Sequence, residues 1–162
     1  MEIVTLVRYN HALRLAYLEA MANLSLEDVV APRGLSFDCM RNVFVHLTLV
    51  EDRWISYTIP GRFSEWVDPD FNAFTSMDLL KSYMQLVHGA TEKYFSALTE
   101  QELKRQIVMP WSQTPIKLDI DACLTHMVME CMVHYGELSA AFWQMGLEAP
   151  YKPFWRYKHQ NP

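Results

Sequence analysis

Three side chains, His46, Glu130 and His134, have the types and spacing that could hold a divalent metal ion. His46 lies in the apolar run VFVHLTLV, and His134 lies on the apolar side of a predicted helix, between Cys131 and Leu138. Glu130 precedes His134 by four residues, so the two side chains share one helix face, with Cβ atoms about 5–6 Å apart. Polar side chains in such apolar surroundings need a partner, because burying them unpaired costs free energy.

Two imidazoles and one carboxylate are a ligand set of catalytic zinc sites and of non-haem iron sites, and three protein ligands leave positions open for water or substrate. The pattern therefore predicts a metal centre. Two other interpretations stay open: a hydrogen-bonded core histidine at His46 beside a simple Glu130–His134 pair, and a role for His126. His126 lies about 12 Å from His134 along the helix axis, so it could pair with Glu130 or replace His134 in a shifted site.

Other chemistry is not indicated. The sequence has no glycine-rich phosphate loop, no GxSxG elbow and no HExxH helix, so no cofactor-binding motif or catalytic residue is assigned. The three cysteines, Cys39, Cys123 and Cys131, form no CxxC pair and lie in apolar segments, which predicts inert packing in a reducing compartment. His11 and His88 are predicted to be peripheral, because neither has a ligand-type companion at helical spacing.

Composition limits the class of protein. The chain has 162 residues, 51% of them apolar and 20% charged, which fits one domain over residues 1–162 with a full core. The net charge of −5 and the scattered basic residues argue against a nucleic-acid partner. A secretory signal and a bilayer-spanning window are both missing, so we expect no membrane partner and a cytoplasmic location.

Apolar residues recur at steps of three and four along most of the chain, which predicts four helices. They cover the N-terminal residues to about 23, residues 36–58, residues from 75 or 76 to about 98, and residues 119–145. Thr75 and Asp78 resemble a capping box at the third start, and Gly146 ends the fourth helix. The predicted fold class is all-α, a four-helix bundle.

The connections refine this prediction. Residues 60–74 are long for a turn between helices, and a connection of that length suits a crossover that makes the second and third helices parallel. The link between residues 98 and 119 could hold a short extended piece around 107–111. The tail, residues 151–162, alternates aromatic and basic side chains, and we expect its aromatic rings to dock on the domain rather than to stack nucleic-acid bases.

Three segments resemble the DinB/YfiT-like family. YNHALRLAYLEAMANLS is similar to its opening helix, VFVHLTLVEDRWI to its second-helix pattern of His, Glu and Trp, and HMVMECMVHYGELSAAFWQMG to its final helix. The resemblance spans residues 4–146 and implies an up-down-down-up bundle, with a metal held by His46, Glu130 and His134. It also implies a homodimer and a small-molecule substrate, since characterised relatives include transferases and isomerases that use low-molecular-weight thiols.

The sequence departs from the family pattern at three positions. Glu130 stands where the family commonly has His, Tyr135 where it has Arg, and Glu137 where it has Gln. A carboxylate ligand favours zinc, iron or manganese over a thiolate-loving metal, with nickel also considered. The resulting hypothesis is an enzyme of hydrolase or thiol-transferase type whose metal activates water or a thiol. The alternative is a non-catalytic, stress-related or interaction bundle in which the same residues form a metal-free polar cluster.

Large apolar side chains outside the four apolar stripes predict association into a homodimer. These residues are Phe63, Trp66, Phe71, Phe74, Trp111, Trp143 and Trp155. The competing explanation is that the long connection and the tail fold back over the bundle of the same chain.

Overall fold

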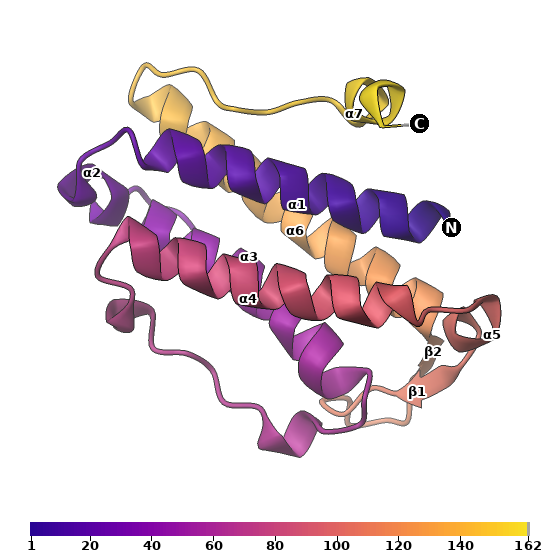
Figure 1. Ribbon diagram of the computed structural model, residues 1–162. Coiled ribbons are helices and arrows are strands. Elements are labelled where there is room, and N and C mark those ends of the chain that lie inside the picture. Colours follow the sequence, from indigo (N-terminus) through magenta and orange to yellow (C-terminus); the bar gives the residue numbers. More distant parts are fainter. Residues whose placement is uncertain (162) are drawn as a thin grey trace.

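The computed structural model describes residues 1–161, and this part of the chain is mostly helical. Four long helices dominate it: α1 (Glu2–Met21), α3 (Met40–Asp52), α4 (Met77–Ser96) and α6 (Ile120–Gln144). Helices α1 and α3 both pack against α6, and α4 packs against α3 and α1. Along the chain, α3 and α4 run from left to right in Figure 1, whereas α1 and α6 run from right to left. Within residues 1–161, no helix combines the length and the apolar character that a bilayer crossing requires.

Side-chain caps explain where the predicted helices begin. Ser76 caps α4, because its hydroxyl accepts a hydrogen bond from the amide of Leu79, at 3.3 Å. The cap is therefore Ser76 and not Thr75. Asp119 caps α6 by accepting a hydrogen bond from the amide three residues further on, which explains the predicted start near residue 119. Gly146 adopts φ 71°, a left-handed conformation that ends the helix as predicted.

The second predicted helix begins later than expected and changes its winding near its end. A short helix, α2 (Leu26–Val30), and a bridge between Leu35 and Asp38 precede α3. Asp38 has φ 73°, which is incompatible with a helix, so the predicted start at residue 36 is wrong by four residues. After α3 the chain continues as one π-helical segment, η1 (Arg53–Thr58).

Two irregular connections link the remaining helices. Residues 60–76 contain the short turns η2 (Phe63–Glu65) and η3 (Phe71–Ala73) and form the lower edge of the view in Figure 1. Between α4 and α6 lie α5 (Glu100–Leu103) and the antiparallel strands β1 (Gln106–Val108) and β2 (Lys117–Asp119). The extended piece expected near residue 107 is confirmed.

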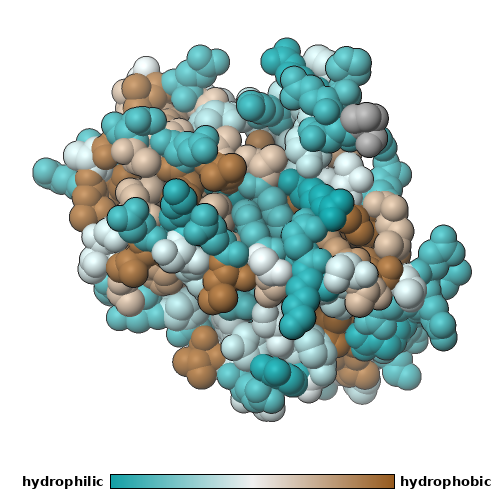
Figure 2. Space-filling model, viewed as in Figure 1, coloured by the Kyte–Doolittle hydropathy of each residue, from teal (hydrophilic) through white to brown (hydrophobic). Residues whose placement is uncertain are grey.

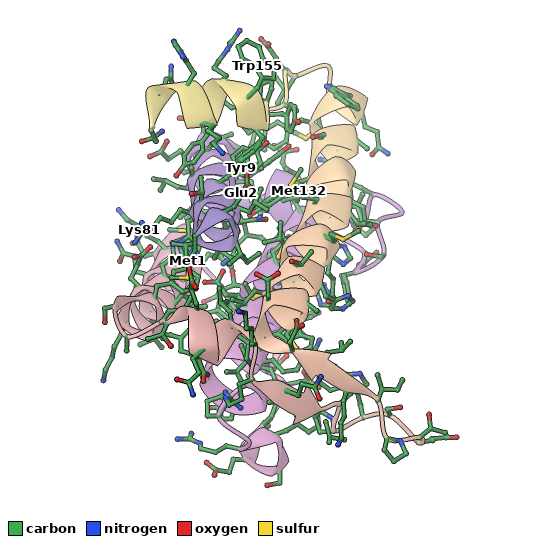
Figure 3. All side chains as sticks on the ribbon, turned by 90° about the vertical axis from the view of Figure 1, so that its right-hand side faces the viewer. Met1, Glu2, Tyr9, Lys81, Met132 and Trp155 are labelled. Atoms are coloured by element: carbon green, nitrogen blue, oxygen red, sulfur yellow. The ribbon has the colours of Figure 1, made fainter. Side chains whose placement is uncertain are left out.

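The C-terminal tail docks on the bundle, as predicted. Its helix α7 (Phe154–Gln160) lies over α1 (Figure 3), where the ring of Tyr9 is 5.2 Å from that of Phe154 and 5.4 Å from that of Tyr157. The Tyr9 hydroxyl donates a hydrogen bond to the carbonyl oxygen of Lys152, at 2.6 Å. Trp155 points away from α1 and stays exposed.

The core takes up only some of the extra aromatic residues. Trp66, Phe71 and Phe74 are half-buried and pack against the core of the same chain, which agrees with the fold-back explanation for the connection. Trp111, Trp143 and Trp155 remain exposed. On the face that Figure 2 shows, hydrophobic residues lie in small groups between hydrophilic ones. The three cysteines are buried and free, as expected.

Candidate metal centre

Two groups of His and Glu side chains have ligand atoms within 4.8 Å of one another, so each could hold a metal ion on distance alone. The first group is the predicted one, His46, Glu130 and His134. The second consists of His11, Glu51 and His88. Each group draws one residue from α3, and the surroundings of the two groups decide which one suits a cation.

The structure brings the three predicted residues together. His46 comes from α3, and Glu130 and His134 come from α6, which packs against α3. The Nε2 atom of His46 lies 3.5 Å from Oε1 of Glu130, and the rings of His46 and His134 meet edge to face with centroids 4.6 Å apart. All three side chains are half-buried, so solvent or a small ligand can reach them.

Glu137 orients the imidazole of His134. The Nδ1–H group of His134 donates to Oε2 of Glu137 at 2.6 Å, and the amide and hydroxyl of Ser36 donate to the same carboxylate at 2.9 and 2.8 Å. Burial alone would raise the pKa of Glu137, but these hydrogen bonds hold it below its ordinary value. With its proton on Nδ1, His134 keeps the lone pair on Nε2 for a ligand role, an arrangement typical of metal-binding histidines.

A tight turn before α3 positions the partners of both histidines. The amide of Asp38 donates to the carbonyl of Leu35 at 2.9 Å, and Asp38 tolerates its positive φ better than most residues with a side chain. This turn places Ser36 on Glu137 and stacks the ring of Phe37 on that of His46, with centroids 4.0 Å apart.

Glu130 is ionised and has two histidine neighbours. Contact with His46 is the main reason that its pKa lies below the ordinary value, with smaller contributions from Arg53 and His126, while burial opposes them. The Nε2 atom of His126 lies 3.4 Å from Oε2 of Glu130, but the side chain is 59% exposed. His126 thus approaches the second carboxylate oxygen of Glu130 and does not join the three mutually close donor atoms.

The second group already contains a cation. The Nη1 atom of Arg14 donates to Glu51 at 2.7 Å and to Nε2 of His88 at 3.2 Å. His11 lies 2.7 Å from the other oxygen of Glu51, which also accepts a hydrogen bond from the hydroxyl of Thr91. Arg14 and Glu51 are almost fully buried, and a divalent ion beside a buried guanidinium would be strongly repelled. This group is therefore an ion-pair network, and the first group is the candidate metal centre.

The same network determines whether Glu51 and His88 are charged. Burial would raise the pKa of Glu51, but the Arg14 guanidinium holds it well below its usual range. Burial and the same guanidinium lower the pKa of His88 to about 3, so its ring is neutral at pH 7 and accepts from Arg14. The rings of His88 and His11 stack with centroids 3.7 Å apart. The prediction that these two histidines are peripheral is therefore wrong.

Helical spacing in the sequence could have indicated Arg14, Glu51 and Glu137, whose roles the sequence analysis missed. Arg14 follows the inward-facing Asn10 by four residues, and Glu51 follows the inward-facing Leu47 by four, so both lie on core-facing sides of their helices. Glu137 lies three residues after His134, within reach on the same helix.

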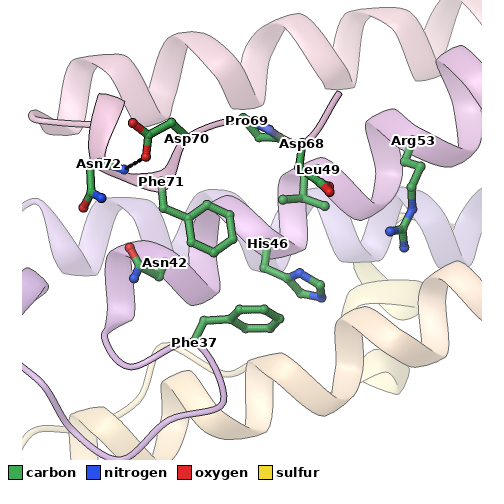
Figure 4. Close-up of a pocket in the computed structure, with 10 residues that line it drawn as sticks. All are labelled: Phe37, Asn42, His46, Leu49, Arg53, Asp68, Pro69, Asp70, Phe71 and Asn72. Carbon is green, nitrogen blue, oxygen red and sulfur yellow. Dashed lines mark hydrogen bonds between the residues drawn. The ribbon is translucent and has the colours of Figure 1, made fainter. Parts of the chain in front are cut away.

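A cavity of about 540 Å³ opens beside His46 (Figure 4). His46, Leu49 and Arg53 line it from one side, since steps of three and four residues put them on one helix face. Phe37 and residues 68–72 line the other sides. The cavity gives a small molecule access to His46.

A comparison with known protein families gives a match over the described part of the chain. Residues 1–161 match the family model of the DinB family. The chain belongs to the DinB family. The match extends the resemblance carried by the three segments, residues 4–146, to the whole described chain. A comparison with curated proteins gave no match. DinB proteins are metal-associated, and this DinB chain has one His/Glu group, the candidate metal centre, that could bind a metal without a buried guanidinium beside its ligand atoms.

Proposed function

We propose that this DinB protein is a metal-dependent enzyme that acts on a small molecule, with His46, Glu130 and His134 as the metal ligands. The hydrogen bond from His134 to Glu137 carries the proposal, because it leaves Nε2 free as a donor beside Glu130 and His46. Two imidazoles and one carboxylate suit zinc, iron, manganese or nickel. Such an ion, when bound, lowers the pKa of a water molecule or a thiol toward neutrality.

The residues of the chain supply orientation and shielding. Glu137 keeps the proton of His134 on Nδ1, and Phe37 covers one face of the His46 ring. Burial raises the pKa of the Cys131 thiol to about 12, so Cys131 is a poor nucleophile. A reactive thiol would therefore have to arrive as a low-molecular-weight substrate, and the reaction would be of thiol-transferase type. If water is the nucleophile instead, the reaction would be a hydrolysis.

The fold supports this assignment of ligands. We infer that α1, α3, α4 and α6 form a single-domain, four-helix bundle with up-down-down-up topology. In that arrangement α3 and α4 are parallel, so the long connection between them carries the chain along the bundle from one end to the other (Figure 1), and α3 can face α6. The proposed ligands then come from two facing helices.

A second candidate function is a non-catalytic bundle with a metal-free polar cluster. It is favoured by one observation: both oxygens of Glu130 already have histidine neighbours, His46 at 3.5 Å and His126 at 3.4 Å. Such contacts would partly satisfy the carboxylate without an ion.

Metal content separates the two candidates. Protein purified without a chelator or a histidine tag is expected to hold about one divalent ion per chain, because three ligands form one centre. Elemental analysis by mass spectrometry measures this ratio. A ratio near zero, both as purified and after reconstitution with zinc, iron, manganese and nickel, would leave the polar cluster as the better description.

We also propose that a second copy of the chain covers the outer side of α6. Met129, Val133 and Trp143 are 64%, 68% and 65% exposed, and steps of four and ten residues put them on one side of the helix. Gly136 lies between them, and its lack of a side chain permits close approach of another helix. An apolar helix side of this kind fits a two-fold contact, in which the same surface serves both copies.

Light scattering at micromolar concentration is expected to give about twice the chain mass of 19.0 kDa. Trp143→Glu should produce a monomer, because a charge in the contact would be desolvated. The matched control, Trp155→Glu, changes an equally exposed tryptophan on α7 and should leave the dimer intact. A mass near that of one chain for the parent protein, or a Trp143→Glu variant that stays dimeric, would refute the α6 contact.

A further inference from the structure

Arg53 is a cation at the edge of the candidate metal centre, where its charge also lowers the pKa of Glu130. It is the first residue of η1, and its Nε atom is buried with no hydrogen-bond acceptor. No ion pair among residues 1–161 includes Arg53. Because the protein covers Nε, the terminal Nη groups are the donors with which Arg53 lines the cavity and can meet a ligand.

Aromatic contacts hold the Arg53 guanidinium in place. Its central carbon lies 5.7 Å from the ring centroid of Trp111, in the loop between β1 and β2, a distance typical of a cation–π contact. Trp111 in turn meets Trp54 edge to face, with centroids 5.1 Å apart. Because an aromatic ring and not a carboxylate holds the side chain, the Nη hydrogen-bond donors of Arg53 stay available to a ligand.

The other surfaces of the cavity limit what the ligand can be. Leu49, Phe37 and Phe71 form an apolar middle, and Asp70 lies at the end opposite Arg53 (Figure 4). Asp68 also lines the cavity. The carboxylates of Asp68 and Asp70 accept hydrogen bonds within their own loop. A second negative charge on the ligand would approach these carboxylates and be repelled.

We propose that the cavity binds a small monocarboxylic acid with an apolar body, whose carboxylate pairs with Arg53. The planar guanidinium can donate two parallel hydrogen bonds to a carboxylate, and the apolar body would pack against Leu49 and Phe71. The inference depends on the proposed function in one respect: it takes the bound acid to be the substrate of the metal centre at His46.

Three probes test the inference. Benzoate is the monocarboxylate, benzamide is its neutral analogue, and phthalate carries a second carboxylate. Binding is measured by calorimetry with the metal-free and the zinc-loaded protein. Benzoate should bind about tenfold more tightly than benzamide or phthalate in both forms, and Arg53→Gln should remove the preference over benzamide. Arg62→Gln is the matched control, because Arg62 is an exposed arginine paired with Glu65 and should change nothing.

The outcomes separate this inference from the metal proposal. A preference for benzoate that appears only with zinc and survives Arg53→Gln would place the carboxylate on the metal and overturn the inference. Equal binding of benzoate and benzamide, or no binding of either, would also overturn it. Phthalate binding as tightly as benzoate would overturn the restriction to one carboxylate. If the metal-free protein prefers benzoate over benzamide and Arg53→Gln removes this preference, the Arg53 site is supported even where the protein takes up no metal.

Thermal unfolding checks that the Arg53→Gln and Arg62→Gln variants are folded.

Discussion

Replacing Arg14 with Met is expected to lower the free energy of unfolding by roughly 3–5 kcal/mol, the usual cost of removing one partner of a buried ion pair. The substitution leaves Glu51 almost fully buried with its charge uncompensated, 2.7 Å from where the Nη1 atom of Arg14 was. His88 loses a donor as well, since the same nitrogen contacts its Nε2 atom. Urea denaturation followed by circular dichroism measures the change.

The double variant Arg14→Met with Glu51→Leu is the control. It removes both charges and keeps apolar volume, so it should recover most of the lost stability. If the single variant does not fold, a folded double variant still supports the explanation. A single variant that loses less than about 1 kcal/mol, or a double variant no more stable than the single one, would show that the ion pair does not matter in this way. Metal content should not change in the double variant, because Arg14 belongs to the other group.

Replacing His134 with Ala should reduce metal content from about one ion per chain to near zero. The variant removes one of three proposed ligands, and its effect should exceed the roughly 10–100-fold loss of affinity typical for residues that only orient a ligand. Zinc binding measured against a chromophoric chelator gives the affinity, and circular dichroism checks the fold.

Two matched variants locate the site. His126→Ala removes a neighbouring histidine that contacts only the second oxygen of Glu130 and should bind metal as the parent does. Glu137→Gln should weaken binding about tenfold, because the orienting charge on His134 is lost while the shape is kept. Retained binding in His134→Ala together with lost binding in His126→Ala would move the site to His126.

Much of the helical part of this protein follows from local sequence. Apolar steps of three and four predict α1, α4 and α6, and Asp119 and Gly146 bound α6 through contacts within a few residues. The i, i+4 spacing of Glu130 and His134 places both on one face whatever surrounds the helix. These features depend on neighbours along the chain, so the chain order alone determines them.

The turn before α3 shows where this local reasoning fails. Apolar residues continue the helical pattern from residue 36, yet Asp38 adopts a positive φ because Ser36 and Phe37 gain distant partners. The amide and hydroxyl of Ser36 bind Glu137, 101 residues away. Such contacts outweigh the weak helix preference of a few residues and could not be predicted from the segment itself.

The sequence by itself determined which residue types were available: four histidines and two glutamates that could form two groups, a fourth predicted helix that aligns Glu130 with His134, and enough apolar residues for a core. Only the tertiary structure decided that His46 meets that pair, and that Arg14 enters the other group at Glu51. Both outcomes depend on how α3 is rotated about its axis between its neighbouring helices. The rotation is set by packing along the whole length of the helices, which no short segment specifies.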